Sequence, residues 1–368
     1  MQDICSQIPP PANRVVGLDI MRVSLAFLIF MFHSRIHVLH CSYGALNNFV
    51  DMGAIAMTGF FLLSGYVINL NYGRKDVTQT EELRRFYLKR FISIIPLYFV
   101  WASLQVITNI VLNGKEAAME EILLFPIELF GIQSVFSSLF PYSHNGGSWF
   151  ISCILICYFL FPLIQVNTKR ATDRNRIQLI FFLSAVLLWS PLVQQYFHLQ
   201  SIYSNPFFRL LEFTIGVLVS QLNQSSCPCK MISALRNSFV CIMSLVGLIV
   251  GVSLARKINI PHDYMLYNWI ALPCFIALTV SLGCHDFRNL QNSKILRYLS
   301  ELSFCIFLGQ IKYVWSIVKY VLGYFGSESN IMKILVSFLV VLCIANILHY
   351  FVEKPSSRYL TQRLITSK

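Results

Sequence analysis

"DIMRVSLAFLIFMFHSR", residues 19–35, has the apolar character of a helix that crosses a lipid bilayer, yet it carries ionisable side chains. Such groups are costly inside a membrane and mark functional candidates. Arg22 and His33 are eleven residues apart, close to three helical turns, so both project from one face, roughly 16 Å apart. Asp19 lies one turn before Arg22 and can pair with it. The stretch predicts a spanning helix that presents a cation and a proton acceptor to one shared cavity.

The rest of the chain is similarly apolar. Its 368 residues are 56% hydrophobic and 12% charged, whereas a soluble domain has about 25% charged residues. The net charge of +12 could suggest a nucleic-acid partner. The basic residues, however, lie in short loops between apolar runs, where membrane topology places them, so no nucleic acid is expected. The composition indicates a polytopic membrane protein.

Membrane-spanning helices need about 20 mostly apolar residues. Because an isolated strand in lipid leaves its backbone groups unpaired, every such run should be helical. The expected fold is therefore an all-α, polytopic membrane helix bundle of about ten transmembrane helices. The predicted spans are residues 16–39, 50–70, 91–112, 149–166, 177–197, 207–222, 238–255, 264–283, 298–321 and 331–352.

An eleventh apolar run, 122–140, contains Pro126, Glu128 and Gln133. If it does not span, most Lys and Arg residues fall in cytoplasmic loops; if it spans, this bias collapses. We therefore expect it to lie on the outer face or to re-enter the membrane. Both termini are then cytoplasmic. The predicted division is a cytoplasmic segment 1–15, a transmembrane domain 16–352 and a cytoplasmic tail 353–368.

His33 has two interpretations of similar weight. A neutral imidazole suits general-base catalysis because its pKa lies near neutrality. It suits equally a polar packing role, hydrogen-bonded to a neighbouring helix. A metal site is a weaker third interpretation, since His33, His37 and His40 have helical spacing but no acidic ligand follows nearby. No metal is expected.

The second span, "GAIAMTGFFLLSGY", has a small-residue face typical of close helix packing. Ser64 and Tyr66 near its cytoplasmic end could add hydroxyl groups to a pocket. The next segment, "LRRFYLKRFISIIPLY", begins with a basic cluster. This cluster fits either a lipid-headgroup anchor or a phosphate clamp for a nucleotide-like cofactor. Its members are Arg84, Arg85, Lys89 and Arg90.

"FFRLLEFTIGVL" places Arg209 and Glu212 one turn apart, where pairing lowers the cost of both in lipid. The pair is either structural or lines the outer half of a cavity. Trp149 in "GGSWFI" is expected at the outer membrane interface, where tryptophan commonly anchors.

The order of the motifs is more specific than any one of them. Arg22-x10-His33 is followed by "FFLLSGY", "FYLKRFISIIPLY", "WFISCILICYFLFPLI", "FRLLEFTIGVL", "LSELSFCIFLGQ" and "VEKP". Over essentially the whole chain this succession resembles the acyltransferase-3 family of integral membrane acyltransferases. The resemblance implies a protein of the bacterial cytoplasmic membrane. Such a protein moves an acyl group, usually acetyl, from cytoplasmic acyl-CoA to a hydroxyl of a cell-envelope glycan or its lipid-linked precursor.

The resemblance also implies roles for residues. His33 falls on the catalytic position, Arg22 on the arginine eleven residues before it, and Lys89 and Arg90 near the acyl-CoA phosphates. From the residues themselves we also expect Asp19 in the catalytic group and Arg84, Arg85, Ser64 and Tyr66 near acetyl-CoA. Two positions depart from the family pattern: Ser93 stands where a second arginine is common, and Gln310 stands where a histidine is common. The residues expected near the glycan acceptor are Arg209, Glu212, Trp149 and Gln310.

Two alternatives come from other functional classes. Intramembrane charges also fit a transporter or flippase for a glycan or small solute, although no inverted repeats or paired broken helices are visible. The second alternative is a degenerate family member that has lost activity and acts as a structural partner. For the enzyme, direct transfer and an acyl-histidine intermediate on His33 both stay open. The expected partners are acyl-CoA, the glycan acceptor and membrane lipids.

Overall fold

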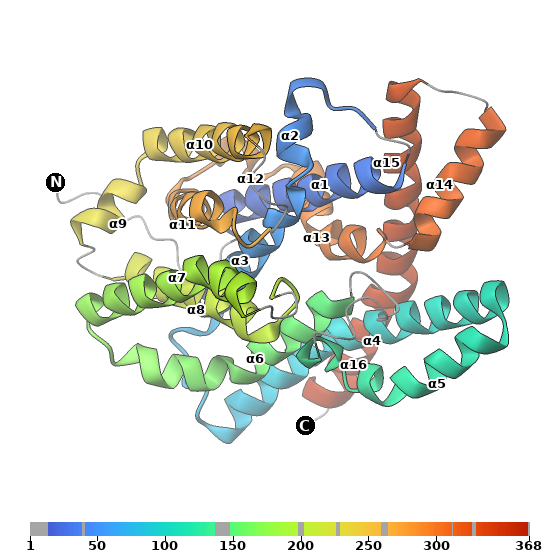
Figure 1. Ribbon diagram of the computed structural model, residues 1–368. Coiled ribbons are helices and arrows are strands. Elements are labelled where there is room, and N and C mark those ends of the chain that lie inside the picture. The colour runs from blue at the N-terminus through green and yellow to red at the C-terminus, as the bar shows by residue number, and fades with distance from the viewer. Residues whose placement is uncertain are drawn as a thin grey trace.

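The computed structural model describes residues 14–38, 41–136, 148–197, 202–225, 229–258, 264–310, 312–325 and 329–366. Every regular element in these ranges is a helix, which confirms the expected all-α class. The long helix α1 lies in the middle of the bundle and packs against α3, α11 and α13 (Figure 1). The main helices are α1 (Val16–His37), α3 (Ala56–Tyr72), α4 (Thr80–Asn113), α5 (Lys115–Leu129), α6 (Ser148–Lys169), α7 (Asp173–Tyr196), α8 (Pro206–Asn223), α10 (Ser238–Lys257), α11 (Asn268–Cys284), α13 (Lys294–Leu308), α14 (Lys312–Phe325) and α15 (Asn330–Ile347).

Short elements connect them. A π-helical turn, η5 (Leu348–Glu353), joins α15 to α16 (Lys354–Thr361). The others are η1 (Gly44–Leu46), α2 (Asn47–Val50), η2 (Gly53–Ile55), η3 (Gln133–Val135), α9 (Lys230–Leu235), α12 (Arg288–Gln291) and η6 (Gln362–Thr366).

Several helices begin at side chains suited to that position. The oxygen of an N-cap residue accepts a hydrogen bond from a backbone N–H that would otherwise have no partner. Asn205 does this for α8, and Pro206 supplies the pre-set φ of its first turn. Thr172, Asn237 and Ser293 cap α7, α10 and α13 in the same way. These polar loop residues explain why the helices start where they do.

Seven helical stretches of the described chain are long and apolar enough to cross a membrane. They match seven of the ten predicted spans and together indicate a multi-pass membrane protein. Of the other three, 207–222 corresponds to α8, which carries a buried ion pair, and 264–283 corresponds to α11, which has 17 residues. The last span does not stop at 352, because helix continues to Ile365. The count of about ten and the side of each terminus stay predictions.

The prediction of one helix over 298–321 is wrong. α13 ends at Leu308, and α14 begins at Lys312. Gly309 caps α13, and glycine weakens a helix at such a point. The carbonyl of Gln310, freed by the break, accepts a hydrogen bond from the indole N–H of Trp315 at 3.1 Å. The break places the Gln310 side chain beside α1.

The run 122–140 belongs partly to α5, which begins earlier than predicted and folds back along α4 (Figure 1). Gly114 makes the turn with a φ of +73°, a conformation that glycine adopts at little cost. α5 has 15 residues, fewer than the about 20 that a span needs. Residues 137–140 lie outside the described ranges, and the placement of this segment at the membrane stays a prediction.

The closest helix crossing in the core joins α3 to α8. A Cβ atom added to Gly65 would lie 2.0 Å from the carbonyl oxygen of Phe213, and one added to Gly216 would lie 2.0 Å from that of Leu62. Small residues allow membrane helices to approach this closely. At Gly65, the packing interpretation of the small-residue face is confirmed.

Gly216→Ala is expected to destabilise the protein by about 1–3 kcal/mol, because a methyl group must push two backbones apart. The fraction of protein that stays monodisperse in detergent after heating measures this loss. Gly247→Ala in α10 is the matched control: its nearest neighbour is Cys274 Sγ at 3.9 Å, so the methyl group has room. Equal heat resistance of the two variants would contradict the proposed close crossing.

Candidate active site

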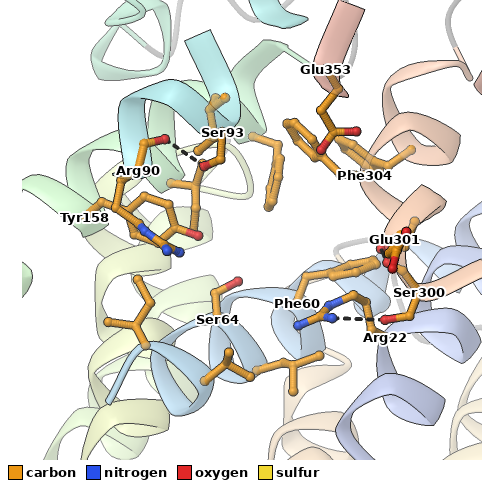
Figure 2. Close-up of a pocket in the computed structure, with 18 residues that line it drawn as sticks. Arg22, Phe60, Ser64, Arg90, Ser93, Tyr158, Ser300, Glu301, Phe304 and Glu353 are labelled. Atoms are coloured by element: carbon orange, nitrogen blue, oxygen red, sulfur yellow. Dashed lines mark hydrogen bonds between the residues drawn. The ribbon is translucent and has the colours of Figure 1, made fainter. Parts of the chain in front are cut away.

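A cavity of about 310 Å³ lies between α1, α3, α4, α6, α13 and the turn η5 (Figure 2). Phenylalanine side chains form much of its wall, and polar groups from several helices point into it. The polar lining includes Arg22, Ser64, Arg90, Tyr158, Ser300 and Glu353. An apolar cavity with a few convergent polar groups is the usual form of a small-molecule site.

Arg22 is held at the cavity from behind. Its Nη1 donates to Asp19 Oδ1 at 3.2 Å and to Ser300 Oγ at 3.0 Å, and Ser300 Oγ donates in turn to Asp19 at 2.6 Å. The predicted pairing of Asp19 with Arg22 is therefore present. Asp19 also pairs with Arg14. This network fixes the Arg22 guanidinium toward the cavity.

Arg90 reaches the cavity from α4. Its guanidinium lies 5.7 Å from the ring centre of Tyr72 and 5.8 Å from that of Tyr158, which suits cation–π attraction. No carboxylate pairs with it among the ion pairs of the described ranges, and its buried Nε has no hydrogen-bond partner there. Figure 2 shows the guanidinium groups of Arg22 and Arg90 directed at the space beside Ser64. Glu301 and Glu353 also line the cavity, but the side beside Ser64, where the two guanidinium groups point, can receive an anion.

The predicted four-residue basic clamp does not form one surface. At 100° per residue, its members spread around α4, so only Arg90 lines the cavity. Arg84 and Arg85 are exposed and pair with Glu81, and Lys89 is exposed. These three side chains point to the surroundings of the bundle, where the lipid-anchor interpretation applies.

Ser64 and Tyr66 also separate. Ser64 lines the cavity. Tyr66 is buried, and its hydroxyl accepts a hydrogen bond from Asn223 Nδ2 at 2.6 Å. A Cβ atom on Gly283 would lie 2.5 Å from that hydroxyl. Tyr66 thus packs at the contact of α3 with α8 and α11, away from the cavity lining.

His33 lies beside the break between α13 and α14. Its Nδ1 is 3.1 Å from Gln310 Oε1, and Gln310 Nε2 donates to the carbonyl of Ile306 at 3.0 Å. The second bond fixes the amide orientation, so Oε1 must accept and Nδ1 must carry the hydrogen. The Nε2 atom of His33 is then left with a free lone pair. Gln310 cannot titrate, but it selects the tautomer that a general base needs.

His33 is not among the residues that line the cavity, so the expected shared cavity reaches only Arg22. The rings of Phe60, Phe150 and Phe307 pack against one another with centroids 4.9–6.5 Å apart. All three rings line the cavity, and Phe307 lies one turn before Gln310, the hydrogen-bond partner of His33.

Of the other histidines in the predicted triplet, only His37 is described. Its ring centre lies 5.8 Å from that of His33 and 5.8 Å from that of Trp315, on which it stacks. His40 lies outside the described residues. The contact with Trp315 indicates a packing role for His37.

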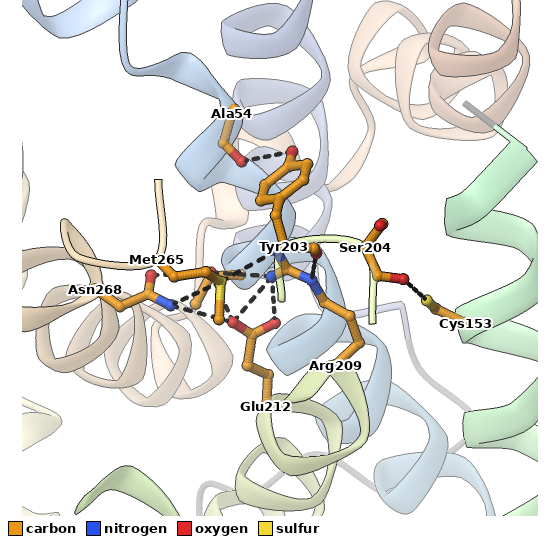
Figure 3. Close-up of polar contacts among 9 residues, drawn as sticks. Ala54, Cys153, Tyr203, Ser204, Arg209, Glu212, Met265 and Asn268 are labelled. Carbon is orange, nitrogen blue, oxygen red and sulfur yellow. Dashed lines mark hydrogen bonds and ion pairs between the residues drawn. The ribbon is translucent and has the colours of Figure 1, made fainter. Parts of the chain in front are cut away.

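A second polar centre surrounds Arg209 and Glu212 (Figure 3). Both side chains have zero exposed area, and Arg209 Nη1 lies 2.7 Å from Glu212 Oε2. Glu212 Oε1 accepts from Thr58 Oγ1 at 2.8 Å and from Asn268 Nδ2 at 3.3 Å. Arg209 Nε donates to the carbonyl of Tyr203 at 2.8 Å. The predicted pair is therefore present, enclosed by α3, α8 and α11.

Aromatic rings complete this enclosure. The Arg209 guanidinium lies 4.7, 5.5 and 5.6 Å from the ring centres of Tyr203, Trp149 and Phe61. Burial raises the pKa of the Tyr203 phenol, in the loop before α8, so this ring stays neutral. Trp149 is 4% exposed, and its ring faces a buried cation instead of headgroups, so the expected anchoring contact is absent; its depth in the membrane stays a prediction. The contacts favour a structural role, and acceptor binding by these residues stays a prediction.

Sequence reasoning missed several cavity residues. Ser300 and Ser303 are three residues apart in "LSELSF", so helical spacing puts both on one face, and this signal was available. Glu301 and Glu353 lie near the ends of predicted spans, and the sequence did not indicate that they line a cavity. Tyr158 lies in a wholly apolar stretch, where no local pattern distinguishes it.

Comparisons with known proteins add to this geometry. A family model described as an acyltransferase domain matches residues 15–350. Acyltransferase MdmB from Streptomyces mycarofaciens is 24% identical over 399 residues, an alignment that covers 97% of this chain and 95% of that protein. No solved structure matches the chain.

Proposed function

The chain belongs to the acyltransferase domain family, and from this premise we propose that it moves an acyl group, acetyl foremost, from cytoplasmic acyl-CoA to a hydroxyl of a cell-envelope glycan or its lipid-linked precursor. The apolar helices make it a membrane acyltransferase of the multi-pass kind. The donor, the acceptor and the bacterial inner membrane as its location belong to the proposal.

The observation that carries the proposal is the meeting of Arg22 and Arg90 in one cavity. Acyl-CoA is an anion with several phosphates, and arginine binds phosphate by paired, charge-assisted hydrogen bonds. The phenylalanine walls suit the apolar acyl group. A volume of about 310 Å³ is at the lower end of ligand sites. It therefore suits one arm of the donor, with the remainder outside the cavity.

His33 supplies the chemistry in this proposal. The acceptor hydroxyl attacks the thioester carbon, a C–O bond forms and the C–S bond breaks. His33 Nε2, which Gln310 leaves unprotonated, takes the hydroxyl proton and passes it to the departing CoA thiolate. Because His33 does not line the cavity, this step requires the acyl group to move beyond the cavity, toward the contact of His33 with Gln310. An acyl-histidine intermediate would use the same Nε2 atom as the nucleophile.

The function is tested with purified protein and labelled acetyl-CoA. Covalent transfer or thioester hydrolysis supports an enzyme. The break between α13 and α14 is a feature that transporters also use, and for a transporter the thioester would stay intact. The mass of envelope glycans from cells with and without the protein then identifies the acceptor by its acetyl groups.

Arg90→Gln is expected to raise the KM for acyl-CoA by about 10- to 100-fold, because a charged hydrogen bond contributes about 1.5–3 kcal/mol. Initial rates over a range of acetyl-CoA concentrations measure it. Arg85→Gln, on the same helix but exposed and paired with Glu81, is the matched control and should keep its KM. An equal rise of the KM in both variants would support the four-residue phosphate clamp instead. An unchanged KM in both would support the interpretation of the whole basic cluster as a lipid anchor.

A further inference from the structure

Three side chains with metal-binding atoms meet behind the cavity wall. They are Cys305 on α13 and His349 and Glu353 on the turn η5, and their ligand atoms all lie within 4.8 Å of one another. Cys305 Sγ donates to Glu353 Oε2 at 3.2 Å, and His349 Nδ1 lies 2.6 Å from the same oxygen. The three groups converge on one point, although two of them are more than forty residues from the third.

The charges at this point are incomplete. Cys305 has no exposed area, and His349 is 4% exposed. Within the described ranges, the ion pairs of Glu353 include His349 but no Lys or Arg. The partly exposed Glu353 carboxylate is thus shared by a thiol and an imidazole without a fixed positive charge paired to it. A cation would complete the set.

The backbone supports a dedicated site. η5 interrupts the α-helical path as a π-helical turn, and such turns occur frequently at functional sites. It carries His349 and Glu353 toward α13 together, and Glu353 also lines the cavity (Figure 2). One side of the cluster is therefore closed by protein, and the other meets the cavity.

We propose that Cys305, His349 and Glu353 bind one divalent transition metal ion, with Zn²⁺ as the best fit. Thiolate, imidazole and carboxylate are the ligands that Zn²⁺ prefers, whereas Mg²⁺ and Ca²⁺ avoid sulfur. Tetrahedral Zn²⁺ with bonds of about 2.0–2.3 Å separates its ligand atoms by about 3.3–3.6 Å. The sulfur–oxygen distance is close to this value, and the nitrogen–oxygen distance must widen by less than 1 Å.

Binding would release one proton. The Cys305 thiol loses its hydrogen to solvent and becomes a thiolate. The His349 hydrogen shifts from Nδ1 to Nε2, which has no acceptor among the described residues, so that Nδ1 can coordinate the metal. The fourth position would face the cavity beside Glu353, open to water. The ion would tie α13 to η5 and neutralise an acidic group in the wall of a cavity that we propose for an anionic donor. The metal site itself does not depend on that donor.

The test measures metal, not activity. Full-length protein is purified in detergent, incubated with excess ZnCl₂, passed through a desalting column and analysed by mass spectrometry for zinc. We expect about one zinc per chain, and a loss of most of it in Cys305→Ser and His349→Gln. Cys274→Ser on α11, a half-buried cysteine outside the cluster, should keep its zinc.

Co²⁺ gives a second readout, since a cobalt–thiolate bond absorbs in the near ultraviolet. This band should appear in the parent protein and in Cys274→Ser and be absent from Cys305→Ser. If His349→Gln cannot be purified, the cysteine variants and the cobalt spectrum still test whether Cys305 binds the metal. Zinc that the parent protein does not retain, or zinc and a cobalt band that persist in Cys305→Ser, would overturn the proposal.

Discussion

His33→Ala is expected to lower the rate of acyl transfer by a factor of about 10² to 10⁴, because the variant removes the base proposed to accept the hydroxyl proton. The contact of Nδ1 with Gln310 leaves Nε2 as the only basic atom of the ring. An alanine at this position removes that atom, which is also the nucleophile of the acyl-histidine mechanism. The same loss is therefore expected for either mechanism.

The measurement is transfer of labelled acetyl groups by purified protein, normalised to the monodisperse fraction. His37→Ala is the matched control, one turn further along α1, with its ring stacked on Trp315. We expect this variant to keep most of its activity. Full transfer activity in His33→Ala would show that His33 is not needed for the reaction. A loss of activity confined to His37→Ala would assign the general base to His37 instead.

Gln310 refines this comparison. Gln310→Leu keeps a side chain of similar size but offers no acceptor to His33 Nδ1, so the ring is no longer held in one tautomer. We expect activity between those of the parent and His33→Ala, with a shifted pH–rate profile. A residue that served packing alone would leave the profile unchanged.

The sequence predicts the all-helical membrane class of the protein and the ion pair on α1. Long apolar runs interrupted by basic loops predict a membrane helix bundle, and the three-residue spacing of Asp19 and Arg22 predicts their pairing, which the structure contains. These features are local, because they depend on helical periodicity and on the cost of charge in lipid. Local rules also place Arg209 next to Glu212.

What the sequence did not predict depends on contacts between distant segments. Gly309 is a local signal for the helix break after Leu308, but the contact that the break allows, Gln310 with His33 on α1, joins residues 277 positions apart. The direction of each basic residue on α4 depends on which face meets α6. Trp149 was interpreted as an interfacial anchor because no residue near it in the sequence indicates that its ring contacts the buried guanidinium of Arg209.

Glu212→Gln is expected to destabilise the protein by about 3–5 kcal/mol, because it leaves the Arg209 charge buried without its partner. Glutamine keeps the shape of glutamate, and its oxygen can still accept from Thr58 and Asn268. Its amide nitrogen replaces Oε2 and cannot accept from Arg209, so the variant removes one hydrogen bond together with the charge. Titration with sodium dodecyl sulfate in mixed micelles measures the free energy of unfolding.

Asp173→Asn at the start of α7 is the matched control. Asp173 and Arg176 have the same spacing and the same 2.7 Å distance as the buried pair, but their side chains are 29% and 14% exposed. Partly solvated pairs contribute about 1 kcal/mol or less. A similar loss in the two variants would show that burial does not set the strength of these pairs.

The double variant Arg209→Met with Glu212→Gln separates structure from acceptor binding. Removing both charges of a buried pair is often neutral, so most of the lost stability should return. If this protein then transfers acetyl groups at the parental rate, the pair only holds α8 against its neighbours. If it folds but its KM for the glycan acceptor rises, Arg209 and Glu212 bind the acceptor as their position in the sequence predicts, and the enclosure in this structure must open during the reaction.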